Sequence, residues 1–574
     1  MKELKWWQKA VFYQIYPRSF ADGNGDGIGD FKGMIEKLDY LQELGIDAVW
    51  LSPHFPSPFV DCGYDISDYE NVAPEYGTLD DFRQFLVGAH QRNIRVILDL
   101  VLNHTSDQHA WFLESRSSRT NPRRDWYIWR DPKPDGSPPN NWLSTFDGPA
   151  WEYDKLTGQY YYHYFFRQQP DLNWRNPEVK EAMFHSVRFW LDMGVDGFRL
   201  DAIGTIFEDP AFPNQPLDMT YLELRHLTRT AHTSEEQKEA GRVWDTIFQY
   251  QLEQPGIHEL MQELRMVMDE YGAGERVLVA ENDNIAYHGN GSNELHMVFN
   301  FPLMQTSRIT PAHVLANQQT RLAALASISP GAWPCNTLSN HDTPRMVSRF
   351  GDGQHDNELV RLHLALLLTL KGTPFLYNGD EIGMRNLRLT DISQFRDSMA
   401  TWLYHMEVEQ FGVDPVEALK NAAGFTRDQG RSPMQWSNIP NAGFCPEGVQ
   451  PWLPVNPDYA CGVNAADQIG NSESLLHFYH RFLHLRRKTP ALVEGEYLPL
   501  DAGNEECLAF LRRTESQACL VALNFSGKPF TLDFTKVAVL KNCHTARVLF
   551  PGRQILPVIR FDVPAWGILV TEVK

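Results

Sequence analysis

The chain has 574 residues, 43% hydrophobic and 22% charged, the composition of a globular protein with about two or three domains. Its 52 Lys and Arg against 73 Asp and Glu give a net charge of −21, which excludes a general basic field for binding nucleic acid or an anionic membrane. The 7 Cys form no CxxC pair and the first residues carry no apolar signal core. We therefore expect a cytoplasmic protein with reduced thiols, a monomer or small homo-oligomer.

Apolar strands and amphipathic helices alternate from the start of the chain. The pattern predicts strands at 11–17, 46–53 and 94–101, with helices at 31–44 and 79–92. Buried strands that alternate with helices pair in parallel, so we expect an α/β protein with a closed (β/α)₈ TIM barrel. In that fold the residues that carry chemistry follow the C-terminal ends of the strands.

An Asp- and Gly-rich loop follows the first predicted strand. Oxygen-bearing side chains recur at every second position, and Ile28 can add a backbone carbonyl; the candidate ligands are Asp22, Asn24, Asp26, Ile28 and Asp30. An all-oxygen set of this kind suits Ca²⁺, with Mg²⁺ as the alternative. The loop lacks the closing Glu and the preceding helix of an EF-hand, so we expect a structural ion. The competing interpretation is a solvated turn without metal.

Two segments depart from the barrel pattern. Residues 105–174 are rich in Trp, Tyr, Pro and Asn without helical period, which predicts an inserted subdomain after strand 3. Short alternating strands after about residue 494, such as 519–525, predict a C-terminal antiparallel β-sandwich domain at 494–574. The barrel then comprises 1–104 and 175–493. The polar segment 207–256 matches no pattern that we can interpret.

Three carboxylates follow later predicted strands. A helix at 181–193 ends at Gly194, and the next strand brings Arg199 and Asp201 onto one face. We expect Arg199 to keep Asp201 ionised, as a nucleophile requires, although a single Arg–Asp pair is more often structural. Glu281 and Asp342 end two further strands, and three carboxylates on one rim fit glycoside cleavage.

At this point the chain resembles the α-amylase superfamily, glycoside hydrolase family thirteen, and within it the α-glucosidase and oligo-1,6-glucosidase branch. The motifs that carry the resemblance are DLVLNH at 99–104, QPDLN at 169–173, GFRLD at 197–201, AE at 280–281 and SNHD at 339–342. The resemblance implies Asp201 as nucleophile, Glu281 as general acid/base and Asp342 as transition-state stabiliser. It also implies that Arg199, His104 and His341 bind the sugar in the cleavage subsite.

Two further segments resemble elements of this branch. DCGYD at 61–65 implies that Asp61 binds the hydroxyls of the non-reducing end and that Tyr64 stacks on the sugar ring. TRDQGRSPMQW at 426–436 implies that Arg431 pairs with Asp61, which blocks the cleft and makes the enzyme exo-acting. The loop at 22–30 is similar to the Ca²⁺ loop of the branch.

The resemblance predicts a retaining exo-α-glucosidase that hydrolyses short α-glucosides and can also transfer glucose. Ala202, which follows the nucleophile, favours α-1,4 over α-1,6 linkages, whereas Asn282-Asp283-Asn284 leaves the acceptor preference open. The alternative is a trehalose synthase-like enzyme that transfers or isomerises with the same carboxylates. A non-catalytic protein on this fold, like amino-acid-transporter heavy chains, is disfavoured because the three carboxylates are intact.

Overall fold

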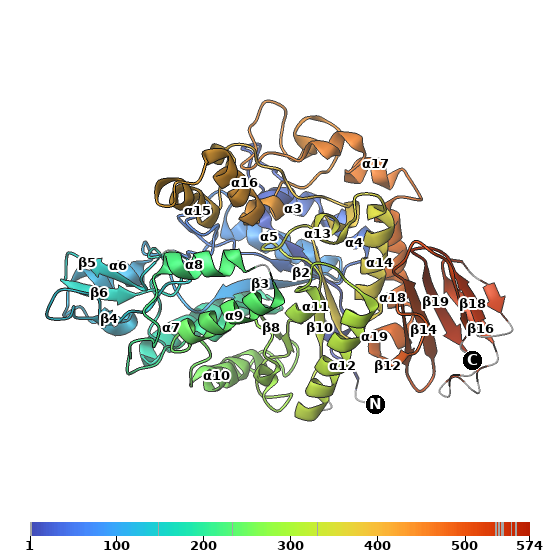
Figure 1. The fold of residues 1–574 in the computed structure, drawn as a ribbon, viewed down its shortest axis with the longest axis horizontal. Helices are drawn as coiled ribbons and strands as arrows, with labels where there is room; N and C mark the ends of the chain where they lie inside the picture. Colours follow the sequence, from blue (N-terminus) through green and yellow to red (C-terminus); the bar gives the residue numbers. More distant parts are fainter. Residues whose placement is uncertain are drawn as a thin grey trace.

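The computed structural model describes residues 3–574 except 147, 232, 330, 534–536, 538–539, 541–542, 544, 553 and 557–559. Eight parallel strands form its centre (Figure 1). Their order in the sheet is β10, β11, β1, β2, β3, β7, β8, β9. Their bounds are Phe12–Ile15 (β1), Ala48–Leu51 (β2), Arg95–Val101 (β3), Gly197–Asp201 (β7), Val277–Ala280 (β8), Met297–Val298 (β9), Cys335–Thr337 (β10) and Thr373–Tyr377 (β11). A parallel bridge between Phe299, directly after β9, and Cys335 of β10 connects the two ends of this strand order. The strands therefore form the predicted barrel.

Helices surround the barrel. They include Phe31–Glu36 (α3), Leu38–Leu44 (α4), Leu79–Gln91 (α5), Pro177–Met193 (α7), Ile257–Asp269 (α10), Pro311–Ile328 (α12), Asp356–Thr369 (α14) and Leu475–Arg487 (α18). The helix predicted at 31–44 is two helices, because the N–H of Lys37 bonds the carbonyls of Met34 and Ile35 and interrupts the regular ladder. Gly194 ends α7 as predicted, with a φ of 104° that glycine adopts readily.

The remaining α-helices complete the chain. They are Trp6–Lys9 (α1), Pro17–Phe20 (α2), Ala110–Ser117 (α6), Tyr221–Thr230 (α8), Ser234–Phe248 (α9), Phe301–Met304 (α11), Met346–Phe350 (α13), Ser398–Glu409 (α15), Pro415–Phe425 (α16), Ala465–Ile469 (α17) and Pro490–Glu494 (α19). No helix within the described residues is long and apolar enough to cross a membrane.

A small three-stranded sheet interrupts the barrel between β3 and α7. It consists of Trp129–Arg130 (β4), Trp151–Asp154 (β5) and Gln159–Tyr162 (β6), with β6 in the middle. Trp142, Trp151 and Tyr162 share an apolar cluster with Leu224 of α8 and Phe248 of α9. The segment 207–256, which sequence patterns left uninterpreted, therefore packs α8 and α9 against this insertion, as seen in Figure 1.

The C-terminal part is a β-sandwich. A six-stranded antiparallel sheet contains Glu496–Leu500 (β12), Cys507–Arg513 (β13), Ala518–Asn524 (β14), Ile568–Val573 (β19), Ala546–Phe550 (β16) and Gln554–Leu556 (β17), in that order. Phe530–Asp533 (β15) and Arg560–Val563 (β18) form the second sheet. Alternate residues of β13 face opposite ways: Phe510 joins the barrel core, whereas Leu511 packs with Phe561 of the second sheet.

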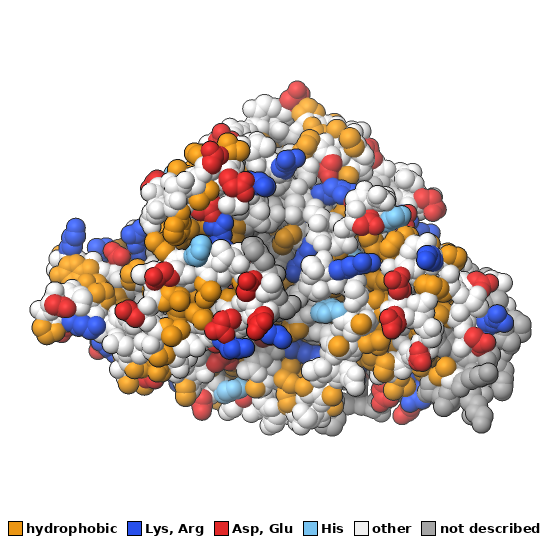
Figure 2. All heavy atoms as spheres, in the orientation of Figure 1, with side chains coloured by type: hydrophobic (Ala, Val, Ile, Leu, Met, Phe, Trp, Pro, Cys, Tyr) orange, Lys and Arg blue, Asp and Glu red, His pale blue; other side chains and the backbone are white. Residues whose placement is uncertain are grey.

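The fold class predicted from the sequence is thus confirmed, while the domain limits proposed from composition stay predictions. Figure 2 shows acidic and basic side chains interspersed over one face of the molecule rather than gathered into a basic patch.

Candidate active site

The three predicted catalytic carboxylates follow the C-terminal ends of three barrel strands. Asp201 is the last residue of β7, Glu281 follows β8 directly, and Asp342 lies in the loop after β10. Because all eight strands are parallel, these ends share one rim of the barrel. The Asp201 side chain is 10% exposed, against 25% for Glu281 and 31% for Asp342, so all three can reach a ligand from partly buried positions.

Arg199 lies between the carboxylates of this rim. It is almost completely buried, and its guanidinium contacts three carboxylates: Nη1 lies 2.6 Å from Asp99 Oδ1 and 2.8 Å from Asp201 Oδ1, and Nη2 lies 2.8 Å from Glu281 Oε2. The Ala202 N–H also donates to Glu281 Oε2, at 3.1 Å. One guanidinium therefore keeps the Asp201 and Glu281 carboxyl groups side by side.

Asp201 is buried beside one cation and two further carboxylates. Burial raises its pKa well above the usual range; Arg199 opposes this, whereas the charges of Glu281 and Asp99 add to it. Arg199 therefore favours the ionised form of Asp201, as expected from the sequence, but it acts against burial and two neighbouring carboxylates. That Arg199 keeps Asp201 ionised at neutral pH stays a prediction.

Asp342 has the opposite electrostatic setting. Burial would raise its pKa, but His341, Arg431 and Arg427 together hold the pKa below its ordinary value. Burial also lowers the pKa of His341 to about 3, so its ring is neutral and the two arginines are what keeps Asp342 ionised. Arg431 Nη2 lies 2.5 Å from Asp342 Oδ1, and Arg427 Nη1 lies 3.9 Å from the same atom.

The neutral His341 ring is fixed on both nitrogens. The Gln14 amide donates to Nδ1 at 2.7 Å, which leaves Nε2 as the donor. Nε2 lies 2.5 Å from the Tyr64 hydroxyl and 3.2 Å from Asp342 Oδ2. The Tyr64 ring stacks on His341, with centroids 5.5 Å apart, and its hydroxyl donates to Asp99 at 3.1 Å. Tyr64 and His341 thus belong to one buried network with Asp99.

The structure corrects the arginine assigned to Asp61. Arg427, not Arg431, pairs with Asp61, with Nη2 2.8 Å from Asp61 Oδ1. Arg431 is fully buried; besides Asp342 it donates from Nε to the His341 carbonyl and lies over the Tyr16 ring. The physical reason is the 3₁₀ turn Arg427–Gly430, which separates the two arginines and points them at different carboxylates.

His104 lies on the other side of Asp61. Its Nε2 is 3.0 Å from the Gln169 amide nitrogen, and the same amide donates to Asp61 Oδ2 at 3.1 Å. Burial lowers the pKa of His104 to about 4, so the ring is neutral at ordinary pH. The inserted segment therefore supplies Gln169 as a bridge between His104 and Asp61.

Sequence patterns missed two members of this site. Asp99 lies in a quoted motif, but only the fold shows that it shares Arg199 with Asp201. Asp397 carries no local signal: it is fully buried at the start of α15 and accepts hydrogen bonds from Arg427 Nη2 at 2.9 Å and Nε at 3.2 Å. The motif at 426–436 contains Arg427 and predicted an arginine that pairs with Asp61. It did not show which arginine forms the pair, because Asp61 lies 366 residues from Arg427 in the sequence.

The predicted metal loop folds tightly. Asp22 Oδ1 accepts the Gly25 N–H at 2.6 Å, and Asp30 caps α3 through the Gly33 N–H, also at 2.6 Å. Gly27 has a φ of 90°, and a Cβ there would lie 2.2 Å from the Gln450 carbonyl, so glycine is required. Within the described ranges no group of three or more His, Cys, Asp or Glu side chains gathers closely enough to hold a metal. The available donors are all oxygens, which is the chemistry Ca²⁺ requires.

Comparison with known proteins agrees with this architecture. Residues 14–495 match the family described as alpha amylase, catalytic domain. An oligo-1,6-glucosidase of Parageobacillus thermoglucosidasius is 40% identical over 92% of this chain and 91% of its own length. An α-glucosidase of Schizosaccharomyces pombe is 37% identical, with 92% of each chain covered. The trehalulose synthase MutB from Pseudomonas mesoacidophila superposes with a TM-score of 0.85 at 37% identity, covering 100% of both chains. The chain therefore belongs to the α-amylase family of glycoside hydrolases.

Proposed function

We propose that the chain is a retaining, exo-acting α-glucosidase that hydrolyses short α-glucosides. The observation that carries the proposal is the Asp201–Glu281 pair, held side by side on one guanidinium. Retaining glycosidases need their two carboxyl groups about 5–5.5 Å apart, whereas inverting enzymes separate them by about 6.5–9.5 Å to admit a water. The closer arrangement is supported by the two carboxylates, each 2.8 Å from a nitrogen of the same guanidinium.

The two carboxyl groups take different parts in the proposed reaction. In the first step Asp201 attacks the anomeric carbon as the bond to the glycosidic oxygen breaks, and Glu281 gives its proton to that leaving oxygen. This step requires Asp201 as the anion and Glu281 as the acid. In the second step water attacks the anomeric carbon of the glucosyl ester and gives a proton to Glu281, while the ester bond breaks and releases Asp201 as the carboxylate.

Asp342 would stabilise the positive charge that develops on the sugar ring. It stays ionised because Arg431 and Arg427 lower its pKa, which is the state required. The neutral His341 beside it can donate a hydrogen bond to a sugar hydroxyl without opposing that charge. Arg199, His104 and Tyr64 complete the proposed cleavage subsite.

The exo mode rests on the Asp61–Arg427 pair. Asp61 is held by Arg427 on one side and by Gln169 on the other, so its carboxylate is fixed to bind the hydroxyls of a terminal glucose. Arg427 is itself clamped by the buried Asp397. A longer chain would have to displace this cluster, and we therefore propose release of one glucose at a time.

The α-1,4 preference rests on Ala202, which has a φ of 41° directly after the nucleophile. A β-branched residue is strained in that left-handed conformation, so Ala keeps this edge of the site small. Asn282 follows the proposed acid/base by one residue and donates to Glu253 at 3.0 Å; the acceptor preference that it was expected to influence stays open. Transfer to a sugar instead of water uses the same glucosyl ester.

A transferring or isomerising enzyme is the second candidate, favoured by the similarity to a trehalulose synthase. Incubation with maltose, isomaltose, trehalose and sucrose separates the two. Free glucose as the main product from maltose supports the α-glucosidase, and a new disaccharide with little free glucose supports the alternative. Sugars that stay unchanged throughout would contradict both.

We also propose a structural Ca²⁺, or Mg²⁺, in the loop at 22–30. Asp22, Asn24, Asp26, the Ile28 carbonyl and Asp30 would hold it. The ion would offset the negative charge of a loop that carries three aspartates, and it takes no part in the proposed chemistry. The cytoplasmic location and the monomeric or small homo-oligomeric state stay predictions from the sequence. Light scattering of the purified chain measures its molar mass and so tests the oligomeric state.

A further inference from the structure

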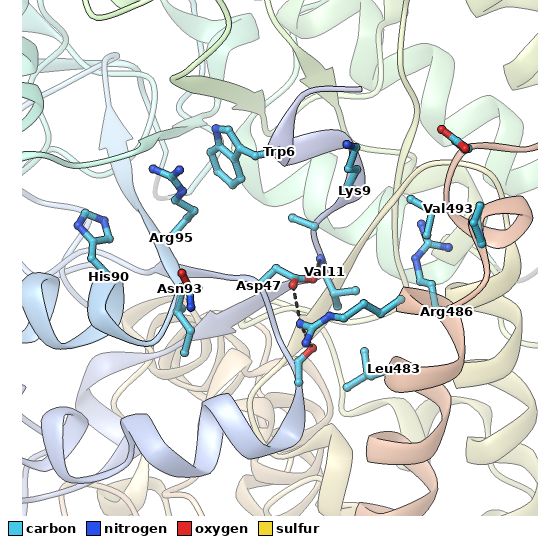
Figure 3. A pocket seen from close by; sticks show the side chains of 16 residues that line it. Trp6, Lys9, Val11, Asp47, His90, Asn93, Arg95, Leu483, Arg486 and Val493 are labelled. Atoms are coloured by element: carbon cyan, nitrogen blue, oxygen red, sulfur yellow. Dashed lines mark hydrogen bonds and ion pairs between the residues drawn. The ribbon is translucent and has the colours of Figure 1, made fainter. Parts of the chain in front are cut away.

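A cavity of about 780 Å³ opens at the end of the barrel opposite the carboxylates. It is lined by residues at or just before the starts of the first three strands, Val11, Asp47 and Arg95, together with residues of α1, α18 and α19 (Figure 3). The catalytic carboxylates follow the C-terminal ends of strands, so this cavity is separate from them. Its volume falls in the range of about 300–1,000 Å³ typical of small-ligand sites.

The lining is cationic in an acidic protein. Four basic side chains face two carboxylates there, with His90 in addition; the basic residues are Lys9, Arg95, Arg486 and Arg487, and the carboxylates are Asp47 and Glu494. The whole chain carries a net charge of −21, so an excess of positive charge around one hollow runs against the overall balance. Such a cavity concentrates small anions.

Arg486 is a buried cation without a direct ion pair among the described residues. It is 1% exposed, and its guanidinium donates to three carbonyl oxygens there: Nη1 to Leu368 and Leu492, at 2.6 and 2.9 Å, and Nη2 to Gly372 at 2.8 Å. Its Nε has no hydrogen-bond partner within the same residues. Burial lowers the pKa of Arg486 to about 10, and the charge of Asp47 opposes that shift. A desolvated cation is costly, and an anion in the cavity would add to the partial compensation that Asp47 provides.

The other cations have carboxylate partners but stay partly exposed. Arg487 Nη2 lies 2.5 Å from Asp47 Oδ1 with 53% of its side chain exposed, and the Arg95 side chain is 43% exposed. Arg95 and His90 both contact the single buried Asp196, at 2.8 and 2.7 Å, and Arg276 reaches the same carboxylate at 3.8 Å. Among the described residues Lys9 pairs with Glu3, at 3.9 Å, and 48% of its side chain is exposed. Figure 3 shows Lys9, Arg95 and Arg486 on different sides of one hollow, a spacing that suits a ligand between them.

We propose that this cavity binds a small phosphate ester through its phosphoryl group. Guanidinium groups match the oxygens of a phosphoryl group. Arg95 and Arg487 would bind it with donors that their carboxylate partners Asp196 and Asp47 leave free, and the unpaired Arg486 Nε would add a donor. Free phosphate would leave much of the volume empty, whereas the half-buried Trp6 ring at the edge offers a flat face for a sugar or another small organic part. The site is independent of the catalytic carboxylates.

Isothermal titration calorimetry with the full chain tests the proposal, using inorganic phosphate, glucose 6-phosphate and unphosphorylated glucose at one ionic strength. Glucose measures binding at the catalytic site, so only additional heat from the phosphorylated probe belongs to the cavity. We expect saturable binding of both phosphorylated probes, tighter for the ester. Saturation by phosphate alone would instead assign free phosphate as the ligand, and no saturable heat from either would overturn the proposal.

Two charge-reversed variants locate the site. Lys9→Glu places a negative charge in the cavity, whereas Lys155→Glu makes the same change on an exposed turn after β5. We expect Lys9→Glu to weaken phosphate-ester binding about tenfold or more, the loss expected for one charge-assisted contact, and Lys155→Glu to leave it unchanged. Arg487→Gln should also weaken binding. Equal affinity in Lys9→Glu, Arg487→Gln and the unchanged chain would contradict this location.

Discussion

Arg427 Nη2 donates to Asp61 Oδ1 across 2.8 Å, and this pair joins two loops that are 366 residues apart. The same guanidinium is held by Asp397 and lies 3.9 Å from Asp342. One arginine thus connects Asp61, which is proposed to bind the terminal glucose, to Asp342, the proposed transition-state stabiliser. Its neighbour Arg431 contacts Asp342 alone among these carboxylates.

This arrangement predicts a specific coupling between variants. Asp61→Asn and Arg427→Gln should each raise KM, and their effects on kcat/KM should be non-additive by about 1–3 kcal/mol, as for residues in direct contact. Asp61→Asn and Arg431→Gln should be nearly additive, within about 0.5 kcal/mol. A double-mutant cycle on maltose hydrolysis measures both. Strong coupling of Asp61 to Arg431, with none to Arg427, would contradict the observed Asp61–Arg427 pair. It would support the Asp61–Arg431 pair expected from the sequence.

The two paired carboxyl groups should respond differently to amide substitution. Asp201→Asn should lower kcat by about four orders of magnitude or more on every substrate, because no nucleophile remains. Glu281→Gln should lower kcat on maltose by about 10²–10⁴ but much less on 4-nitrophenyl α-glucoside, whose leaving group needs no proton.

The exposed Asp245 on α9 offers a matched control, and Asp245→Asn should leave both rates unchanged. Circular dichroism checks that each variant stays folded. An Asp201→Asn enzyme that turns over normally would remove Asp201 from the mechanism.

The sequence predicted the barrel well because its signals are local. Strand 197–201 ends at Asp201 after a helix stopped by Gly194, and both features can be read from neighbouring residues. Pairings between distant loops were not predictable in this way. The Arg427–Asp61 contact depends on how a 3₁₀ turn orients two arginines, and the buried Asp397 has no motif. The raised pKa of Asp201 depends on burial and on Asp99, which only the folded chain brings together.

Buried histidines predict acid sensitivity of the fold. His54 is stacked on Phe82, and burial lowers its pKa to about 3, below the value of about 6.5 expected in the unfolded chain. As pH falls below 6.5, the unfolded chain therefore binds a proton that the folded chain does not, and the unfolding free energy decreases. Each such histidine contributes up to about 1.4 kcal/mol per pH unit until its folded pKa is reached.

Urea unfolding of His54→Phe between pH 6.5 and 4 measures this contribution. The slope of the unfolding free energy against pH should become flatter by up to about 1.4 kcal/mol per pH unit, whatever the change in absolute stability. His363, buried near Phe350 and with its pKa also lowered to about 3 by burial, should give the same result when replaced by Leu. An unchanged slope in both variants would show that neither histidine is neutral in the folded protein.

Metal removal tests the loop at 22–30. If the loop holds Ca²⁺, dialysis against a chelator should lower Tm, and added Ca²⁺ should restore it in proportion to its excess over Kd. Asp22→Asn should lower the Tm of the Ca²⁺-containing protein and reduce the response to chelator. Elemental analysis gives the number of ions per chain. A Tm that responds to neither chelator nor Ca²⁺ would favour the solvated turn.

The anomer of the first product tests the central claim most directly. Proton NMR of maltose cleavage, recorded before mutarotation equilibrates the sugars, reports the configuration of the glucose released from the non-reducing end. A covalent intermediate on Asp201 followed by water attack predicts α-glucose, because two inversions restore the starting configuration. Initial release of β-glucose would contradict the account, since a single displacement by water leaves no covalent role for Asp201.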